Sequence, residues 1–183
     1  MFKASFPFLA FLFVLADQLS KWAVTEMMIR PALGPDAGAP LAFFAWLTGA
    51  PPRLPFAAVE VLPFFNIVMV WNKGVSFGLF NQGSDYGPLL LSFLSLVIAG
   101  IFLVWLFRTT SKLQGLAIAM VIGGAIGNVI DRARFGAVVD FLDVHISGYH
   151  WPAFNIADSC ICVGVFLLII YAFFFETREK DAR

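Results

Sequence analysis

The chain has 183 residues, of which 60% are hydrophobic and 13% are charged, and its mean hydropathy is +0.86. Soluble domains average about 45–50% apolar and about 25% charged residues, so this composition excludes an ordinary soluble domain and predicts an integral membrane protein. The formal net charge is zero, which gives no indication of a nucleic acid as partner. We expect residues 1–183 to form a single integral membrane domain.

Four apolar segments are long enough to cross a bilayer as helices, which requires about 20 residues each. They lie at about residues 4–25, 86–107, 113–130 and 154–175. The first resembles a secretory signal peptide, but "VLADQLSKW" places an acid and an amine where a cleavage site needs small residues, so we expect it to remain as a helix. The predicted fold class is therefore an all-α membrane protein with four transmembrane helices.

Four spans place both termini on one side of the membrane and two longer loops, residues 26–85 and 131–153, on the other. The short segments on the terminal side hold six Lys and Arg residues, whereas the much longer loops hold five. Because positive residues gather in the cytoplasm, we predict cytoplasmic termini and loops on the outer face.

The first long loop has two parts. Residues 31–55 are rich in proline and include the apolar stretch "LAFFAWL", which we expect at the membrane surface. The stretch "VEVLPFFNIVMVWN" is rich in Val, Ile, Phe and Trp, which are typical of strands. We therefore expect a small extracytoplasmic β-sheet, or cradle, on the outer face.

Acidic residues from three spans lie at a similar depth. Counted at 1.5 Å per residue from the charges on the terminal side, Asp17, Asp131 and Asp158 lie about 21, 28 and 27 Å into the membrane. Asp140 lies at the same edge, in the loop between the last two of these. An ionisable residue within a span costs at least about 2.5–3.5 kcal/mol on insertion scales, so several at one level predict a functional site.

Two carboxylates that approach each other cannot both ionise, so one keeps its proton. One can then donate a proton while the other activates water, which hydrolyses an amide without a metal, as in aspartic proteases. The stretch "GGAIGNVIDRARFGAVVDFLD" adds Asn128 and Arg132, and Asn155 precedes Asp158 by one helical turn. These side chains are suited to hold a substrate carbonyl or a lipid headgroup.

The spacing of these residues leaves other interpretations open. The acids could pair with Arg132, Arg134 and Lys21 and simply hold the helices together. They could also relay protons in a transporter, although transporter sites lie near the midplane rather than at one edge. Asp17 and Lys21 have the i, i+4 spacing of an intrahelical ion pair, which predicts a structural role for both.

Two further motifs lack the context that their chemistry requires. "GVSFG" fits the serine-hydrolase elbow with Ser76 as nucleophile, but a further loop follows where that elbow needs a helix. His145 and His150, with Asp140 or Asp143, have the residue types of a metal site, but there is no H-E-x-x-H and no helix to present it. We therefore expect neither a serine nucleophile nor a metal.

Four stretches, "ADQLSKW", "WNKGVSFGLF", "GGAIGNVIDRARFGAVVDF" and "FNIADS", resemble the signature motifs of the bacterial lipoprotein signal peptidases (signal peptidase II), in that family's order. The resemblance implies a multi-pass aspartic endopeptidase of the bacterial inner membrane, with its active site near the periplasmic face. Such an enzyme removes signal peptides from prolipoproteins by cleaving before the diacylglyceryl-modified cysteine, without a cofactor, and is inhibited by globomycin-type peptides. The implied partners are prolipoproteins and membrane lipid, not nucleic acid.

The same resemblance implies roles for individual residues. Asp140 and Asp158 are the expected catalytic pair; Asp131 is the alternative to Asp140, which we do not favour because it is well placed to pair with Arg132 or a helix neighbour. Residues that match substrate-binding and inhibitor-binding positions are Asn72, Asn128, Arg132 and Asn155. Residues expected to support the structure are Asp17, Lys21, Gly74 and Asp131. The chain departs from the family pattern in the length of residues 31–55 and in Val75, where a small residue is usual.

Overall fold

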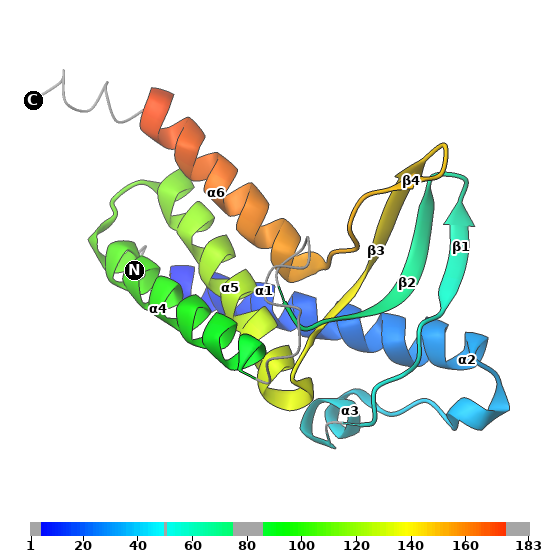
Figure 1. The fold of residues 1–183 in the computed structure, drawn as a ribbon. Coiled ribbons are helices and arrows are strands. Elements are labelled where there is room, and N and C mark those ends of the chain that lie inside the picture. The colour runs from blue at the N-terminus through cyan, green and yellow to red at the C-terminus, as the bar shows by residue number, and fades with distance from the viewer. Residues whose placement is uncertain (1–4, 50, 75–85, 175–183) are drawn as a thin grey trace, which may run out of the picture.

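The computed structural model describes residues 5–49, 51–74 and 86–174. Long helices make up one part of the molecule, and an antiparallel sheet projects from one end of them (Figure 1). Four of the helices are long and apolar enough to cross a membrane. The predicted fold class, four membrane helices with a small sheet, is confirmed.

The four long helices overlap the four expected spans. They are α1 (Ser5–Trp22), α4 (Gly87–Arg108), α5 (Lys112–Phe135) and α6 (Ile156–Phe174). Two of them run further than the sequence indicated, since α1 continues through the π-helical η2 (Ala23–Ile29) and the short α2 (Arg30–Ala32), and α5 continues to Phe135. The continuation of α1 is stabilised by a buried ion pair one turn apart, in which Arg30 Nε lies 2.6 Å from Glu26 Oε2.

Helix α5 is the centre of the helical part, because it packs against α1, α4 and α6. Small residues on α5 allow this close packing. A Cβ atom built on Gly124 would lie 2.3 Å from the carbonyl oxygen of Ala157, and one on Gly127 would lie 2.5 Å from Asp17 Oδ2. The backbones of α5 and α6 therefore approach to a distance that only glycine permits at position 124.

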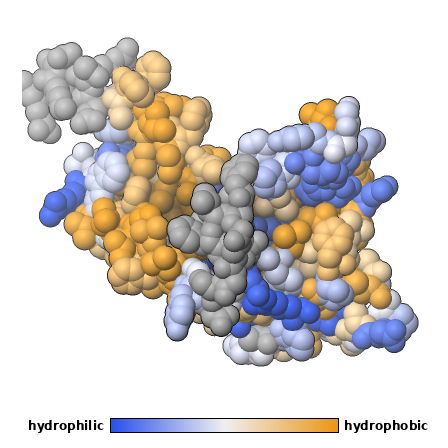
Figure 2. All heavy atoms as spheres, in the orientation of Figure 1, coloured by the Kyte–Doolittle hydropathy of each residue, from blue (hydrophilic) through white to orange (hydrophobic). Residues whose placement is uncertain are grey.

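The surface of the helical part is suited to lipid. Large apolar side chains of α4 face outward, including Leu89, Phe93 and Ile101. Figure 2 shows hydrophobic side chains gathered over the helices, whereas the sheet end mixes hydrophilic and hydrophobic ones. The chain is a multi-pass membrane protein.

The sheet has the order β1-β2-β3-β4, and all of its pairs are antiparallel. Its strands are β1 (Ala58–Leu62), β2 (Phe65–Asn72), β3 (Val138–Ile146) and β4 (Tyr149–His150). Strands β1 and β2 form a hairpin in the region where strands were expected, and β3 begins three residues after α5 ends. Gly136 makes that short turn with a positive φ of 63°, which favours glycine.

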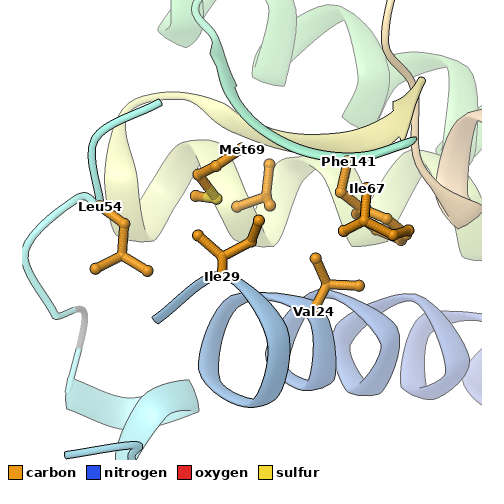
Figure 3. Packing of buried hydrophobic residues seen from close by; sticks show 7 residues of the cluster. Val24, Ile29, Leu54, Ile67, Met69 and Phe141 are labelled. Carbon is orange, nitrogen blue, oxygen red and sulfur yellow. The ribbon is translucent and has the colours of Figure 1, made fainter. Parts of the chain in front are cut away.

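One face of the sheet packs on the extended end of the first helix. In Figure 3, Val24 and Ile29 of the helix point toward the strand residues Ile67, Met69 and Phe141. Burying a side chain of this size stabilises a fold by roughly 1.5–3 kcal/mol. This apolar cluster holds the first half of β3, which carries Asp140, against the ends of the membrane helices.

Candidate active site

Asp140 is the third residue of β3 and lies opposite Val70 of β2. Its carboxylate is buried and accepts two hydrogen bonds from side-chain amides. Asn72 Nδ2 donates to Asp140 Oδ2 at 3.0 Å, and Asn155 Nδ2 donates to Asp140 Oδ1 at 2.8 Å. Both donors are neutral, so they orient the carboxylate without supplying a compensating charge.

Asp158 lies in the first turn of α6, and Asn155 caps that helix. The Asp158 N–H donates to Asn155 Oδ1 at 2.9 Å, and the Asn155 N–H donates to Asp158 Oδ2 at 3.3 Å. This reciprocal pattern is a capping box, which holds both side chains in one geometry. Asn128 Nδ2 of α5 donates to the other carboxylate oxygen, Asp158 Oδ1, at 2.8 Å.

Asn155 joins the two acids. It is fully buried, its side-chain amide contacts Asp140, and its backbone N–H contacts Asp158. The same amide also donates to Asn128 Oδ1 at 3.3 Å and to the carbonyl oxygen of Val139 at 3.2 Å. The structure therefore brings Asp140, Asp158 and three of the four predicted binding residues together, namely Asn72, Asn128 and Asn155.

The surroundings of Asp140 favour its protonated form. Burial, and after it the negative charge of Asp158, raise the pKa of Asp140 to about 7 from its ordinary value of 3.8. The hydrogen bonds from Asn72 and Asn155 act in the opposite direction but are weaker effects. Near neutral pH this group can therefore either hold or release a proton, as acid–base catalysis requires.

The other two acids of the spans form a separate, charge-compensated cluster. Lys21 Nζ lies 2.8 Å from Asp17 Oδ2 and 2.7 Å from Asp131 Oδ2, and all three side chains are fully buried. The remaining oxygens are also used, since Asp17 Oδ1 accepts the N–H of Ala157 and Asp131 Oδ1 accepts the side-chain amide of Gln18. Asp131 Oδ2 also accepts the N–H of Val139. This cluster ties α1, α5, β3 and α6 together.

The predicted Asp17–Lys21 pair is confirmed, and of the partners left open for Asp131 the structure selects Lys21. Asp17 and Lys21 form the expected pair within α1. Asp131 contacts Lys21 of a different helix rather than Arg132, because consecutive residues of a helix point in different directions. The structural interpretation of the acids therefore fits Asp17 and Asp131, whose cation is Lys21.

Sequence reasoning missed Gln18. Its side-chain amide donates to Asp17 Oδ2 at 3.1 Å and to Asp131 Oδ1 at 3.0 Å, and it is buried. The available signal was its place beside Asp17 in "ADQLSKW", one turn before Lys21. Gly74 also has a visible contact, since its N–H donates to Asn72 Oδ1 at 3.0 Å and so orients the amide that holds Asp140.

Arg132 lies near both site acids. Its guanidinium interacts electrostatically with Asp158, Asp140 and Asp131. Its buried Nε has no hydrogen-bond partner among the described residues. A cation with a free donor beside two carboxylates is suited to bind a polar group of a ligand.

A hollow of about 420 Å³ lies next to Asp158. Its walls are mostly apolar and come from α6 and from the segment before it; the lining residues are Trp151, Pro152, Phe154, Asp158, Ser159, Cys162 and Val163. A second hollow of about 410 Å³ under β3 and β4 shares Trp151 and Phe154 with the first. Apolar space therefore lies directly beside a carboxylate, which suits a substrate with an apolar part.

The remaining candidates lie elsewhere. Ser76 falls outside the described residues. His150 Nδ1 contacts the Asp143 carboxylate at 2.8 Å, and Asn66 Nδ2 donates to Asp143 at 3.0 Å. Burial alone would raise the pKa of Asp143, but the hydrogen bonds from His150 and Asn66 together lower it. In the part of the chain that the structure describes, no three His, Cys, Asp or Glu side chains are placed to hold a metal ion.

Comparison with known proteins gives a consistent result. Residues 9–174 match the family described as signal peptidase (SPase) II. The chain is 39% identical to a lipoprotein signal peptidase of Polynucleobacter necessarius over 163 residues. This matched region covers 88% of this chain and 84% of the relative. It is 49% identical to a lipoprotein signal peptidase of Methylobacterium radiotolerans over 123 residues. Here the matched region covers 67% of this chain and 72% of the relative.

Solved structures also resemble this fold. One, described as a bacterial membrane enzyme, has a TM-score of 0.70 and 26% identity and covers 94% of each chain. A second, described in the same words, has a TM-score of 0.65 and 27% identity and covers 92% of this chain and 87% of the other.

Proposed function

The chain belongs to the signal peptidase II family of membrane peptidases, and we propose that Asp140 and Asp158 are the carboxylates with which it removes signal peptides from prolipoproteins. The observation that carries this proposal is Asn155, which contacts both carboxylates at once. Asp131 is the weaker alternative, because its oxygens are occupied by Lys21, Gln18 and the N–H of Val139.

The two acids divide the chemistry between them. Asp140, with its raised pKa, holds the proton of the resting pair, and Asp158 accepts a proton from a water molecule. The water oxygen attacks the scissile carbonyl carbon, and the Asp140 O–H donates a hydrogen bond to the developing oxyanion. Asp158 then transfers its proton to the amide nitrogen as the C–N bond breaks, which releases the signal peptide.

The substrate is positioned by its own lipid. A diacylglyceryl group on the cysteine that follows the scissile bond stays in the bilayer and so holds that bond near the sheet end of the helices. The apolar hollow beside Asp158 receives an apolar part of the substrate, and Arg132 and Asn128 bind its polar backbone. Globomycin-type peptides would inhibit by occupying the same residues.

The orientation follows from the charges of the loops. Six Lys and Arg residues lie in short segments on the side of the termini, which supports cytoplasmic termini in a bacterial inner membrane. The sheet and the acid pair then face the periplasm. Prolipoproteins exported across that membrane present their cleavage site on this face.

The test is cleavage of a diacylglyceryl-modified prolipoprotein by purified protein in detergent. Asp140→Asn and Asp158→Asn should each reduce cleavage to background while the protein remains folded. The matched control is Asp143→Asn, which changes another acid of β3 and should leave cleavage intact. Asp131→Asn should unfold at a lower temperature, but its folded fraction should cleave.

Two results would contradict the proposal. Full cleavage by folded Asp140→Asn, with loss in folded Asp131→Asn, would move the pair to Asp131 and Asp158. Absence of cleavage by the wild type, with proton-coupled flux in vesicles, would support a transporter instead.

A further inference from the structure

Helix α3 (Phe43–Gly49) has two very different faces. Trp46 on one face is 2% exposed, whereas Phe44 on the other is 75% exposed. The helix has seven residues, which is too short to be stable on its own in water. It belongs to the segment 31–55 that is longer than the family pattern, so nothing in the motifs assigns it a role.

The inner face of α3 is attached to the end of α5. The Trp46 ring lies 5.9 Å from the ring of Phe135, which is the last residue of α5. The Arg134 guanidinium carbon lies 4.2 Å from the centre of the Trp46 ring, and Arg134 also donates to the Trp46 carbonyl. The position of α3 along the membrane normal is thus set by the end of a membrane helix.

A second attachment connects the start of α3 to the end of α1. Trp22 is the last residue of α1, and its Nε1 donates to the carbonyl oxygen of Leu41 at 2.8 Å. The Trp22 ring also lies 5.7 Å from the Phe43 ring. The first helix continues beyond Trp22, but the 18 residues from Ser5 to Trp22 already measure about 27 Å, close to the roughly 30 Å of a hydrocarbon core. Both attachments therefore hold α3 at the level where the apolar core of a bilayer ends.

The outer face of α3 is apolar and continues the surface of α1. The chain has no charged residue between Asp36 and Arg53. Phe43 and Phe44 form an aromatic pair with ring centres 5.5 Å apart. Leu19, one turn before Trp22 on α1, is also exposed. The exposed aromatic surface of α3 is therefore continuous with a surface that faces lipid.

We propose that α3 is a membrane-surface anchor, which lies in the bilayer interface at the sheet end of the spans and inserts Phe44 among the lipid chains. Short apolar helices with aromatic residues and no charge on the buried face occupy this zone. The lipid bilayer covers this exposed face, because α3 lies at the depth where two spans end and its apolar surface is continuous with the surface of those spans.

The anchor is also connected to the buried cluster that contains Asp17 and Asp131. Arg134 Nη1 lies 3.3 Å from Gln18 Oε1, and the amide of Gln18 donates to Asp17 and Asp131. A continuous chain of hydrogen bonds therefore runs from α3 to this cluster, and it fixes the depth of the cluster relative to the membrane surface.

The test measures the depth of a fluorophore at position 44. Cys160 and Cys162 are first replaced by alanine, and a thermal unfolding temperature close to that of the wild type confirms that this background is folded. Phe44→Cys is then labelled with NBD in nanodiscs of phosphatidylethanolamine and phosphatidylglycerol. The matched control is Asp36→Cys, an exposed position of the same segment outside the apolar stretch. Ala45→Cys, also on the exposed face, serves as a second position.

The labels at 44 and 45 should be quenched several-fold more strongly by shallow doxyl-labelled lipid than the label at 36, and should emit at shorter wavelength. Aqueous iodide should quench mainly the label at 36. Equal iodide quenching at 44 and 36 would overturn the proposal, since α3 would then face water. Protection at 44 that disappears in nanodiscs with a single protein molecule would also overturn it, because the occupant would be a second copy of the chain.

Discussion

The two acid clusters at the sheet end of the helices are neighbours with opposite properties. Asp17 and Asp131 share the cation Lys21, whereas Asp140 and Asp158 receive mainly neutral amide donors. Asn128 lies between them, since Lys21 donates to its oxygen and its amide donates to Asp158. The difference lies in the contacts: Lys21 forms ion pairs with Asp17 and Asp131, whereas neutral amides hold Asp140 and Asp158, with the Arg132 guanidinium nearby. This arrangement leaves Asp140 able to exchange a proton near neutral pH.

Removal of the shared cation should give the largest effect. Lys21→Met leaves two buried carboxylates without compensation, and breaking a buried pair in this way costs about 3–5 kcal/mol. We expect a markedly lower unfolding temperature in detergent and loss of cleavage through unfolding. The control is Lys73→Met, which changes an exposed lysine and should unfold near the wild-type temperature. An unchanged unfolding temperature in Lys21→Met would show that the cluster does not hold the helices together.

Loss of the amide that joins the two proposed catalytic acids should have the next largest effect. Asn155→Ser keeps a good helix cap but removes the donor to Asp140, whereas Asn155→Ala removes both. We expect each variant to lose about a hundredfold in kcat/KM, because small displacements of catalytic groups cost this much. Only Asn155→Ala should also lose about 1 kcal/mol of stability, the usual contribution of a cap.

Cleavage kinetics and thermal unfolding of the same samples separate the two roles of Asn155. If Asn155→Ser cleaves at the wild-type rate, the amide does not position Asp140. If its activity falls only in proportion to its unfolded fraction, Asn155 acts on stability alone.

The sequence predicted the local parts of both clusters better than the contacts between them. The i, i+4 spacing of Asp17 and Lys21 and the one-turn spacing of Asn155 and Asp158 are local patterns, and the structure contains both. The pairing of Asp131 with Lys21 depends on how α1 is rotated against α5, which periodicity does not specify. The motifs alone likewise gave Asn155 no more than a binding role, whereas the packing of β3 on the start of α6 places its amide on Asp140.

The docking of α3 was not predictable for the same reason. The apolar stretch "LAFFAWL" indicated a membrane surface, but the contacts of Trp46 with Arg134 and Phe135 join segments that are far apart in sequence. The sequence did not indicate the extension of α1 to Ala32, because the charged Glu26 ends the apolar segment. In the structure Glu26 is instead compensated within the helix by Arg30.

The smallest expected effect is a shift in pH dependence, and it tests how neutral donors tune the active cluster. Asp140 must hold a proton to donate a hydrogen bond to the oxyanion, so kcat/KM should fall as pH rises through about 7. The hydrogen bond from Asn72 lowers the pKa of Asp140, so its removal in Asn72→Ala raises that pKa further. The falling limb of the pH–rate profile should therefore move to higher pH, together with a lower maximal rate.

The chain offers a matched control on the same strand. Asn66 of β2 donates to Asp143 of β3 at 3.0 Å, just as Asn72 donates to Asp140, but neither Asn66 nor Asp143 contacts the acid pair. Asn66→Ala should leave the falling limb in place. A limb that moves to lower pH in Asn72→Ala, or moves equally in both variants, would show that Asp140 is not the group that must stay protonated. The proton of the resting pair would then have to be assigned to Asp158.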